Sequence, residues 1–360
     1  MSSPGSAPPA ALRGPARWAQ LHWWRSRPSL ASRLLWPLAT LYGAVAGLDR
    51  WLWRGGARQP QRLPVPVVVV GNLVAGGAGK TPTVIATVQC LRAAGWRPGV
   101  ISRGHGRQGT EVRVLDDTTD AQLGGDEPVL IRRRTGVPVA VGRDRAAAGR
   151  ALLAAAPVVN ILVSDDGLQH HRLHRDAQIL VLDRRGVGNG LLLPAGPLRE
   201  PMPPAPPPRT VVLYNAEQPS TVWPGALAQR RLGGAVALAD WWAGQPAQPE
   251  LLAVLAQRSQ HQPLLAAAGM AEPERFFDML AAAGLKVQRL PLADHADFAA
   301  LPWPANTPDV LITEKDAVKL RPVQVPATRV WVVTLDFSLP EACGQALLSL
   351  LPQPADPATT

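Results

Sequence analysis

"VVVVGNLVAGGAGKTPTV", residues 67–84, decides the fold, because a run of valines leads directly into a glycine-rich loop and then a helical pattern. A wholly apolar run is typical of a strand buried on both faces of a parallel sheet, so we expect a strand over Val65–Gly71. The glycines that follow allow backbone N–H groups to face an anion at the start of a helix. The residues expected to hold nucleotide phosphates are Gly76, Gly77, Ala78, Gly79, Lys80, Thr81 and Pro82.

Two side chains of this loop carry the expected chemistry. Lys80 would reach the β- and γ-phosphates of the nucleotide, and the Thr81 hydroxyl would ligate Mg²⁺. The chain has only four lysines among its 37 basic residues, so a lysine here indicates a requirement that arginine does not meet. The strict motif G-x-x-x-x-G-K-T needs glycine at the position of Val74, which leaves an ordinary glycine-rich turn as the alternative.

Composition sets the frame for the rest of the chain. With 360 residues, of which 46% are hydrophobic and 18% charged, a folded protein of two domains is expected. Cys90 and Cys343 are too few and too far apart for a disulfide framework, which favours a reducing compartment. The net charge of +10 is compatible with nucleic acid, an anionic membrane surface or a phosphorylated substrate as partner.

The N-terminal region has its own composition. Residues 1–16 are expected to be a disordered tail, and residues 17–62 a membrane-associating segment rich in tryptophan and arginine. Its apolar run Leu34–Leu48 contains Pro37 and has fifteen residues, too few to cross a bilayer comfortably. Tryptophan and arginine flanks favour an amphipathic helix lying in the membrane interface, and a helix packed on its own domain is the alternative.

Strand-like runs alternate with helical patterns from Val65 onward, which predicts an α/β fold. We expect a P-loop NTPase-like, mostly parallel sheet flanked by helices in residues 63–208 and a smaller α/β domain in 209–352, with a tail at 353–360. The proline-rich run 200–209 marks the expected boundary. The other expected strands are Gly99–Ser102, Val137–Val141, Val158–Ser164, Ile179–Asp183, Val211–Tyr214, Leu264–Ala268, Val287–Leu290, Val310–Thr313 and Val330–Leu335; the clearest helices are Thr83–Ala94 and Pro273–Ala283.

Two pairs of acidic residues are candidates for the chemistry of phosphoryl transfer. Asp165 and Asp166 close an apolar strand, where carboxylates can hold Mg²⁺ or its waters, although an Asp-Gly turn gives the same pattern. Asp126 and Glu127 follow two glycines and could supply a general base and a metal ligand, or else begin a helix. The histidines after Asp166 have no cysteine pair beside them, so zinc is not expected.

Three further segments hold candidate site residues, and the first of them carries a candidate contact to phosphate or sugar. Arg103 lies among glycines in "ISRGHGRQG", and Arg199 and Glu200 lie on a Gly/Pro loop before the expected boundary. His295, between two aspartates in "DHADF", could orient a catalytic acid or be structural. The segment "TEKDAVKL" lacks the spacing of the guanine-reading motif of GTPases, so guanine specificity is not expected.

Together these segments resemble the tetraacyldisaccharide 4'-kinase family, the lipid A kinases of Gram-negative bacteria. The resemblance rests on "GNLVAGGAGKTP", "ISRGHGR", "GGDEP", "VGRDR", "SDDGLQHH", "GNGLLLPAGPLREP", "DHADF" and "TEKDAVKL", and covers about residues 30–335. It implies transfer of the γ-phosphate of ATP, with Mg²⁺, to the 4'-hydroxyl of a tetraacylated glucosamine disaccharide 1-phosphate. It also implies a place at the cytoplasmic face of the inner membrane, held peripherally on its anionic surface, without nucleic acid or an obligate protein partner.

The resemblance also implies roles for single residues. Asp126 matches the catalytic base and His295 the histidine that pairs with it. Lys80 is a catalytic residue as well as a phosphate ligand, and Thr81, Asp165 and Glu127 are the metal residues. The expected substrate-binding residues are Asp166, Arg103, His105, Arg199 and Glu200. This chain departs from the family in having His105 where tyrosine is frequent and Ala296 where a second histidine is frequent.

Two other classes of protein stay open as alternatives. A membrane-associated P-loop switch ATPase would share the glycine-rich loop and the N-terminal segment, but it has no need of the acids and histidine in "GGDEP" and "DHADF". A nucleic-acid-binding module rests on charge alone, since no zinc-finger, RNP-type or basic-zipper pattern is present.

Overall fold

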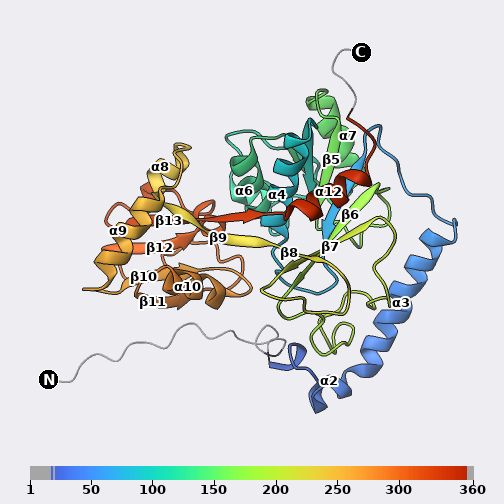
Figure 1. Cartoon of the computed structure of the whole chain (residues 1–360), viewed down its shortest axis with the longest axis horizontal. Helices are drawn as coiled ribbons and strands as arrows, with labels where there is room; N and C mark the ends of the chain where they lie inside the picture. Colours follow the sequence, from blue (N-terminus) through green and yellow to red (C-terminus); the bar gives the residue numbers. More distant parts are fainter. Residues whose placement is uncertain (1–17, 19–20, 355–360) are drawn as a thin grey trace. The chain divides into compact units, whose positions relative to one another are not determined.

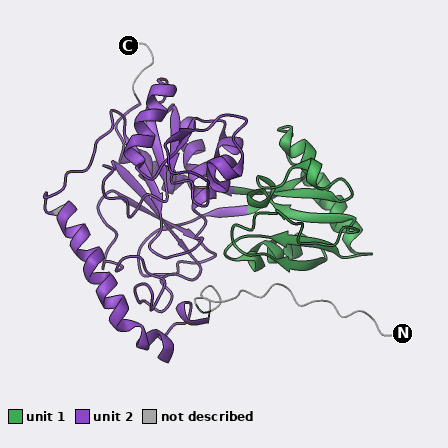
Figure 2. Ribbon diagram, turned by 180° about the vertical axis from the view of Figure 1, so that it is seen from behind, with its two compact units in different colours: residues 1–18, 231–336 green, residues 19–230, 337–360 purple. Residues whose placement is uncertain are grey.

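The computed structural model describes residue 18 and residues 21–354, and the chain forms two compact units (Figures 1 and 2). The larger unit comprises Ala19–Arg230 and is completed by Phe337–Thr360, while Arg231–Asp336 belongs to the smaller unit. The tail expected at residues 1–16 and most of the one expected at 353–360 lie outside the described residues. The two units are therefore described separately below.

The larger unit is built on an eight-stranded sheet in the order β3-β4-β2-β5-β1-β6-β7-β8. All its neighbouring strands are parallel except β3 and β4. The strands are β1 (Val67–Gly71), β2 (Pro98–Ser102), β3 (Arg113–Val114), β4 (Val139–Val141), β5 (Ile161–Asp165), β6 (Ala177–Asp183), β7 (Thr210–Asn215) and β8 (Ala226–Leu227). The mostly parallel α/β sheet predicted from the sequence is confirmed.

The position of β1 between β5 and β6 places the functional loops. In register, Val70 of β1 lies beside Asp165 of β5, and Gly71 lies beside Leu180 of β6. Because parallel strands present their carboxyl ends at one edge, the loop after β1 and the acids after β5 emerge side by side. This edge of the sheet is where open α/β proteins bind ligands.

Helices cover both faces of this sheet, so side chains on both sides of β1 are buried. A continuous run of valines meets this requirement. Val67 and Val69 pack in one cluster with Ala146 and Leu152, and the alternate residue Val68 is equally buried. The helices of the larger unit are α2 (Leu30–Leu34), α3 (Trp36–Arg54), α4 (Lys80–Ala93), α5 (Ala121–Gly124), α6 (Asp126–Thr135), α7 (Arg145–Ala155) and α12 (Glu341–Ser349).

The smaller unit has a five-stranded sheet in the order β11-β10-β12-β13-β9. Its strands are β9 (Gln229–Ala237), β10 (Leu264–Ala268), β11 (Val287–Pro291), β12 (Asp309–Thr313) and β13 (Arg329–Ser338). Its helices are α8 (Leu238–Trp242), α9 (Pro249–Ser259), α10 (Pro273–Ala282) and α11 (Glu314–Ala317), with a 3₁₀ turn at Pro322–Gln324. Phe276 and Phe277 of α10 pack with Leu255 and Leu311 in its core.

The units divide at a different place from the boundary expected at 208/209. The proline-rich run 200–209 joins β6 to β7 inside the larger unit, because Val211 pairs in parallel with Ile179. The division falls instead within β9 and β13, which carry the chain into the smaller unit and back. Stacked prolines stiffen a connection, but they do not decide which sheet the next strand joins.

The N-terminal segment forms α2 and α3, and α3 begins with Pro37 in its first turn. Large apolar side chains of these helices are exposed, at Leu30, Leu34, Trp36, Leu38, Leu41, Val45, Leu48 and Trp51. Those in α3 recur at intervals of mostly three and four residues, which places them on one face of the helix. Among the described residues, no helix combines the length and the apolar character needed to cross a bilayer.

Candidate functional site

The loop between β1 and α4 has the backbone shape of a phosphate-binding loop. Gly79 is the N-cap of α4 with φ of 89°, in the left-handed region, and Lys80 is the first helical residue. A Cβ on Gly79 would overlap the side-chain amide of Asn215, which donates a hydrogen bond to the Ala78 carbonyl at 3.0 Å. Only glycine therefore fits here, and the N-terminus of α4 is left open to an anion.

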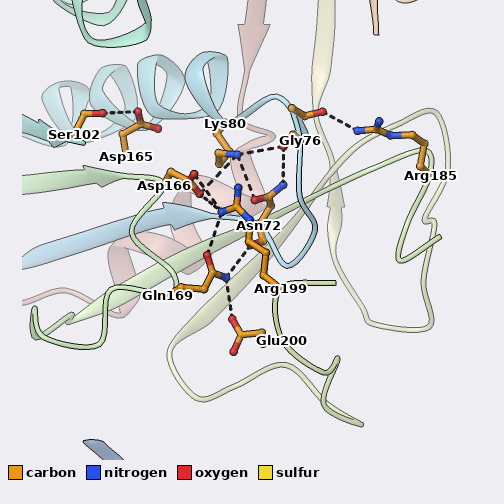
Figure 3. A network of polar contacts seen from close by, with 11 residues as sticks. Asn72, Gly76, Lys80, Ser102, Asp165, Asp166, Gln169, Arg185, Arg199 and Glu200 are labelled. Carbon is orange, nitrogen blue, oxygen red and sulfur yellow. Dashed lines mark hydrogen bonds and ion pairs between the residues drawn. The ribbon is translucent and has the colours of Figure 1, made fainter. Parts of the chain in front are cut away.

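Lys80 lies buried over this loop. Its Nζ is 3.3 Å from Asn72 Oδ1, 3.5 Å from the Gly76 carbonyl and 3.7 Å from Asp166 Oδ1 (Figure 3). The side chain is only 9% exposed, so its charge is partly desolvated and interacts strongly with nearby anions. The lysine is thus held in the phosphate-binding loop by neutral oxygens and one carboxylate.

Asp165 ends β5 with one carboxylate oxygen satisfied and one not. Oδ2 accepts a hydrogen bond from Ser102 at 3.0 Å, whereas the buried Oδ1 has no hydrogen-bond partner among the described residues. Burial, together with the charges of Glu127 and Asp166, raises the pKa of Asp165 to about 7. A buried carboxylate with a spare oxygen and acidic neighbours fits a cation.

The expected metal residues do not form a complete cage. In the described part of the chain, no group of three or more His, Cys, Asp or Glu residues is arranged to hold a metal ion. Thr81 follows Lys80 in the first turn of α4, and Asp165 ends the strand next to β1. A site with one or two protein oxygens fits Mg²⁺, which usually keeps waters and substrate phosphates in its coordination shell.

Asp166 connects Lys80 to the loop that carries Arg199. Its carboxylate accepts hydrogen bonds from Arg199 at 2.9 and 3.2 Å. Burial alone would raise the pKa of Asp166, but Lys80 and Arg199 outweigh it and hold that pKa below its usual range. Asp166 also adopts a positive φ of 46°, uncommon for a residue other than glycine.

Gln169 and Glu200 extend the same network (Figure 3). The Gln169 amide donates to Glu200 Oε1 at 2.9 Å and to the Asn72 carbonyl at 3.1 Å, and its Oε1 accepts from Arg199 at 3.2 Å. The structure therefore brings together the predicted residues Lys80, Asp166, Arg199 and Glu200.

Asp126 and Glu127 begin α6, and both belong to the larger unit. Asp126 is 6% exposed, and its carboxylate accepts a hydrogen bond from the Glu127 backbone N–H at 2.9 Å. A Cβ on Gly125, the residue before, would lie 3.1 Å from Gly104 Cα, so this turn touches the "SRGHG" segment. Within that segment the predicted residues Arg103 and His105 are exposed.

His295 belongs to the smaller unit. It has a positive φ of 61°, and its Nε2 lies 3.8 Å from Asp294 Oδ1, which also pairs with Lys315 at 3.1 Å. The predicted pairing of His295 with Asp126 joins residues of the two units and stays a prediction.

Sequence reasoning missed several polar residues of the site. Arg145, in "VGRDR", is buried near Asp165 and Asp166; burial lowers its pKa to about 10, and the two carboxylates oppose that shift. Arg185 donates to the Gly77 carbonyl at 2.8 Å and stacks on Trp24 at 3.9 Å. Asp183 could have drawn attention to this segment, because it ends a strand next to β1 just as Asp165 does, and Arg185 follows it by two residues.

The phosphate-binding loop, its buried lysine and the acids on neighbouring strands define the class of P-loop nucleotide-binding proteins. Within that class, residues 31–352 match the family model described as tetraacyldisaccharide-1-P 4'-kinase. The chain therefore belongs to this family of kinases.

Relatives and a solved structure agree with this assignment. The chain is 55% identical to the tetraacyldisaccharide 4'-kinase of Leptothrix cholodnii, over 88% of this chain and 91% of that protein. It is 53% identical to the one of Methylibium petroleiphilum, over 96% of this chain and 92% of that protein. The crystal structure of LpxK from Aquifex aeolicus in complex with ATP superposes with a TM-score of 0.71 at 25% identity, over 90% of this chain and all of that one.

Proposed function

We propose that this chain transfers the γ-phosphate of ATP to the 4'-hydroxyl of a tetraacylated glucosamine disaccharide 1-phosphate, a step of lipid A biosynthesis. The observation that carries the proposal is the buried Lys80 in its glycine loop, paired with Asp166 and linked through Arg199 to a polar loop. A phosphate-binding lysine beside a polar loop suits transfer from a nucleotide to a second substrate.

Label transfer from γ-labelled ATP to the disaccharide 1-phosphate in mixed micelles tests this function. We expect labelled lipid with the unaltered protein and at least about a hundredfold less with Lys80→Ala. Lys286→Ala is the matched control, since this lysine belongs to the smaller unit. Label found only in free phosphate would contradict the proposal and favour a switch ATPase.

The nucleotide and its metal would be held by residues at the carboxyl ends of β1 and β5. The loop amides and Lys80 would offset charge on the transferring phosphoryl group. The Thr81 hydroxyl and the Asp165 carboxylate, with Glu127 nearby, would hold Mg²⁺, which stabilises negative charge on the phosphate oxygens. Oδ1 of Asp165, which has no hydrogen-bond partner within the part of the chain that the structure describes, and the raised pKa of that carboxyl support a cation there.

Asp126 would take the proton of the 4'-hydroxyl, and His295 would orient that carboxylate. A sugar hydroxyl has a pKa far above neutrality, so a positioned base assists its attack on the γ-phosphorus. We expect Asp126→Asn and His295→Ala each to lower kcat by about a hundredfold or more, and the double variant to lose little beyond one single variant. Asp117→Asn and His261→Ala, at exposed positions, are controls. Single variants within a few-fold of the parent would refute the dyad.

The acceptor sugar would bind to the polar groups beside the phosphate-binding lysine. The carboxylates of Asp166 and Glu200 would accept hydrogen bonds from its hydroxyls, and Arg199, which pairs with Asp166 at 2.9 Å, would donate to its oxygens. The exposed Arg103 and His105 would add contacts from the turn that packs beside the start of α6. Together these side chains offer both the donors and the acceptors that a phosphorylated sugar requires.

The N-terminal helices would hold the protein on the anionic cytoplasmic face of the inner membrane. Leu38, Leu41, Val45 and Leu48 expose one apolar face of α3, and the exposed Arg33 lies just before this helix. An apolar face flanked by arginine and tryptophan is typical of a helix that lies in the lipid interface. Such a place would bring the site to an acceptor that is embedded in the membrane.

A further inference from the structure

The face of α3 that points into the larger unit contacts the loop that carries Arg199 and Glu200. Tyr42 donates a hydrogen bond to the Arg199 carbonyl at 2.9 Å, and Arg50 pairs with Glu200 Oε2 at 3.1 Å. The side chains of this ion pair are only 19% and 15% exposed. A Cβ on Gly43 would lie 2.7 Å from a methyl carbon of the Leu192 side chain, so helix and loop approach closely. Figure 1 shows α3 running along the edge of this unit.

These contacts continue without interruption to the phosphate-binding lysine. Glu200 accepts from Gln169, Gln169 accepts from Arg199, and Arg199 donates to Asp166. Asp166 in turn lies 3.7 Å from Lys80 (Figure 3). A side chain of α3 is therefore linked to Lys80 through charged and amide groups that each have a defined partner.

The loop itself has little regular structure to fix its shape. Between β6 and β7 the described chain contains no helix or strand, only isolated bridges such as Leu192 with Leu198. Other bonds from the N-terminal segment reach the same loop, including one from the Trp23 indole to the Pro194 carbonyl at 3.0 Å. Contacts from outside the loop therefore add to its own backbone bonds, such as the one from the Leu198 N–H to the Leu191 carbonyl at 3.1 Å, in positioning Arg199 and Glu200.

We propose that Arg50 and Tyr42 are positioning residues for the lipid acceptor, acting through Glu200 and Arg199. This inference rests on the proposed role of Arg199 and Glu200 in acceptor binding. On this proposal α3 has two roles. Its exposed apolar face contacts lipid, and its inner face positions the loop between β6 and β7 that carries Arg199 and Glu200. Lys80 itself contacts Asn72, Gly76 and Asp166, whereas Arg50 and Tyr42 contact Glu200 and Arg199 directly, so losing the inner contacts should affect acceptor binding more than nucleotide binding.

Steady-state kinetics in mixed micelles separate this role from a merely structural one. We expect Arg50→Gln to raise KM for the disaccharide about tenfold while KM for ATP stays within about twofold, and Tyr42→Phe to act in the same direction. Arg50→Lys keeps the charge and restores part of the loss. Arg58→Gln is the matched control, because Arg58 pairs with Asp49 at the surface near the end of α3.

A double-variant cycle tests whether Arg50 acts through Glu200. Arg50→Gln added to Glu200→Gln should change KM for the acceptor less than about twofold beyond Glu200→Gln alone. The inference is overturned if Arg50→Gln behaves like Arg58→Gln, or if both KM values rise together with a lower unfolding midpoint. An unaltered protein that phosphorylates no disaccharide would instead contradict the proposed function.

Discussion

The exposed apolar face of α3 leads to a quantitative prediction for membrane binding. Leu41 and Leu48 are 63% and 58% exposed, so their replacement by glutamine leaves the core intact. Burying a whole leucine side chain contributes about 1.5–3 kcal/mol, and the exposed part accounts for roughly 1–2 kcal/mol per residue. The double variant should therefore lose about 2–4 kcal/mol of binding free energy, or about 30- to 1000-fold in affinity for vesicles.

Co-sedimentation of the full chain with vesicles that contain one anionic lipid in about five measures this loss. The matched control is Val158→Gln with Val222→Gln, which alters two apolar side chains exposed elsewhere on the larger unit, at 65% and 92%. Both double variants should keep the unfolding midpoint of the parent. If the α3 variant binds vesicles within about threefold of the control, this face does not meet lipid and the interfacial role of α3 is refuted.

Three further changes have expected outcomes. Gly79→Ala should weaken ATP binding at least about tenfold by calorimetry, since φ is positive and the new Cβ meets Asn215, whereas Gly47→Ala, with open space around it, should not. Asp165→Asn should cut turnover about a hundredfold at any Mg²⁺ concentration, because the carboxylate expected to hold the metal is lost. The unfolding midpoint should not fall, because the substitution removes a buried charge. A lower midpoint would instead indicate a structural role for Asp165. Burial and, after it, the charge of Arg145 lower the pKa of His170 to about 4, below its unfolded value of 6.5. The free energy of unfolding should therefore fall as the pH drops from about 6.5 towards 4. In thermal melts His170→Gln should flatten this pH dependence, and equal pH profiles of variant and parent would contradict the prediction.

Local patterns in the sequence were enough to predict most of the strands and the phosphate-binding loop, although β9 was missed together with β3 and β8. The run of valines predicts a buried strand, and the glycines before Lys80 predict the turn of the backbone that follows it. Both predictions need only neighbouring residues in the sequence. The same holds for Asp165, whose position at the end of an apolar strand follows from the run before it. Short edge strands such as β3 and β8, two residues each, have too little pattern to be predicted.

Lys80, Asp166, Arg199 and Glu200 were predicted as site residues, but the hydrogen bonds that join them could not be, because these residues come from distant loops. Gln169 joins Asn72, Arg199 and Glu200 only after β1 and β5 have paired and the loop before β7 has closed over them. The boundary between the two units was not predicted correctly for a related reason. Val211 pairs with Ile179, so β7 joins the sheet of the larger unit despite the proline-rich run before it. Which strand another strand will pair with cannot be predicted from local sequence patterns.

The return of the chain to the larger unit has a consequence for synthesis. Lys80, Asp165 and Arg199 all leave the ribosome before β9, yet α12 (Glu341–Ser349), which packs against β6, β7 and α4, follows β13 in the chain. The nucleotide-binding unit therefore stays incomplete until the smaller unit has been made and α12 has followed it. A nascent or truncated chain that stops within β13 would carry every expected catalytic side chain but lack the helix that covers this part of the sheet.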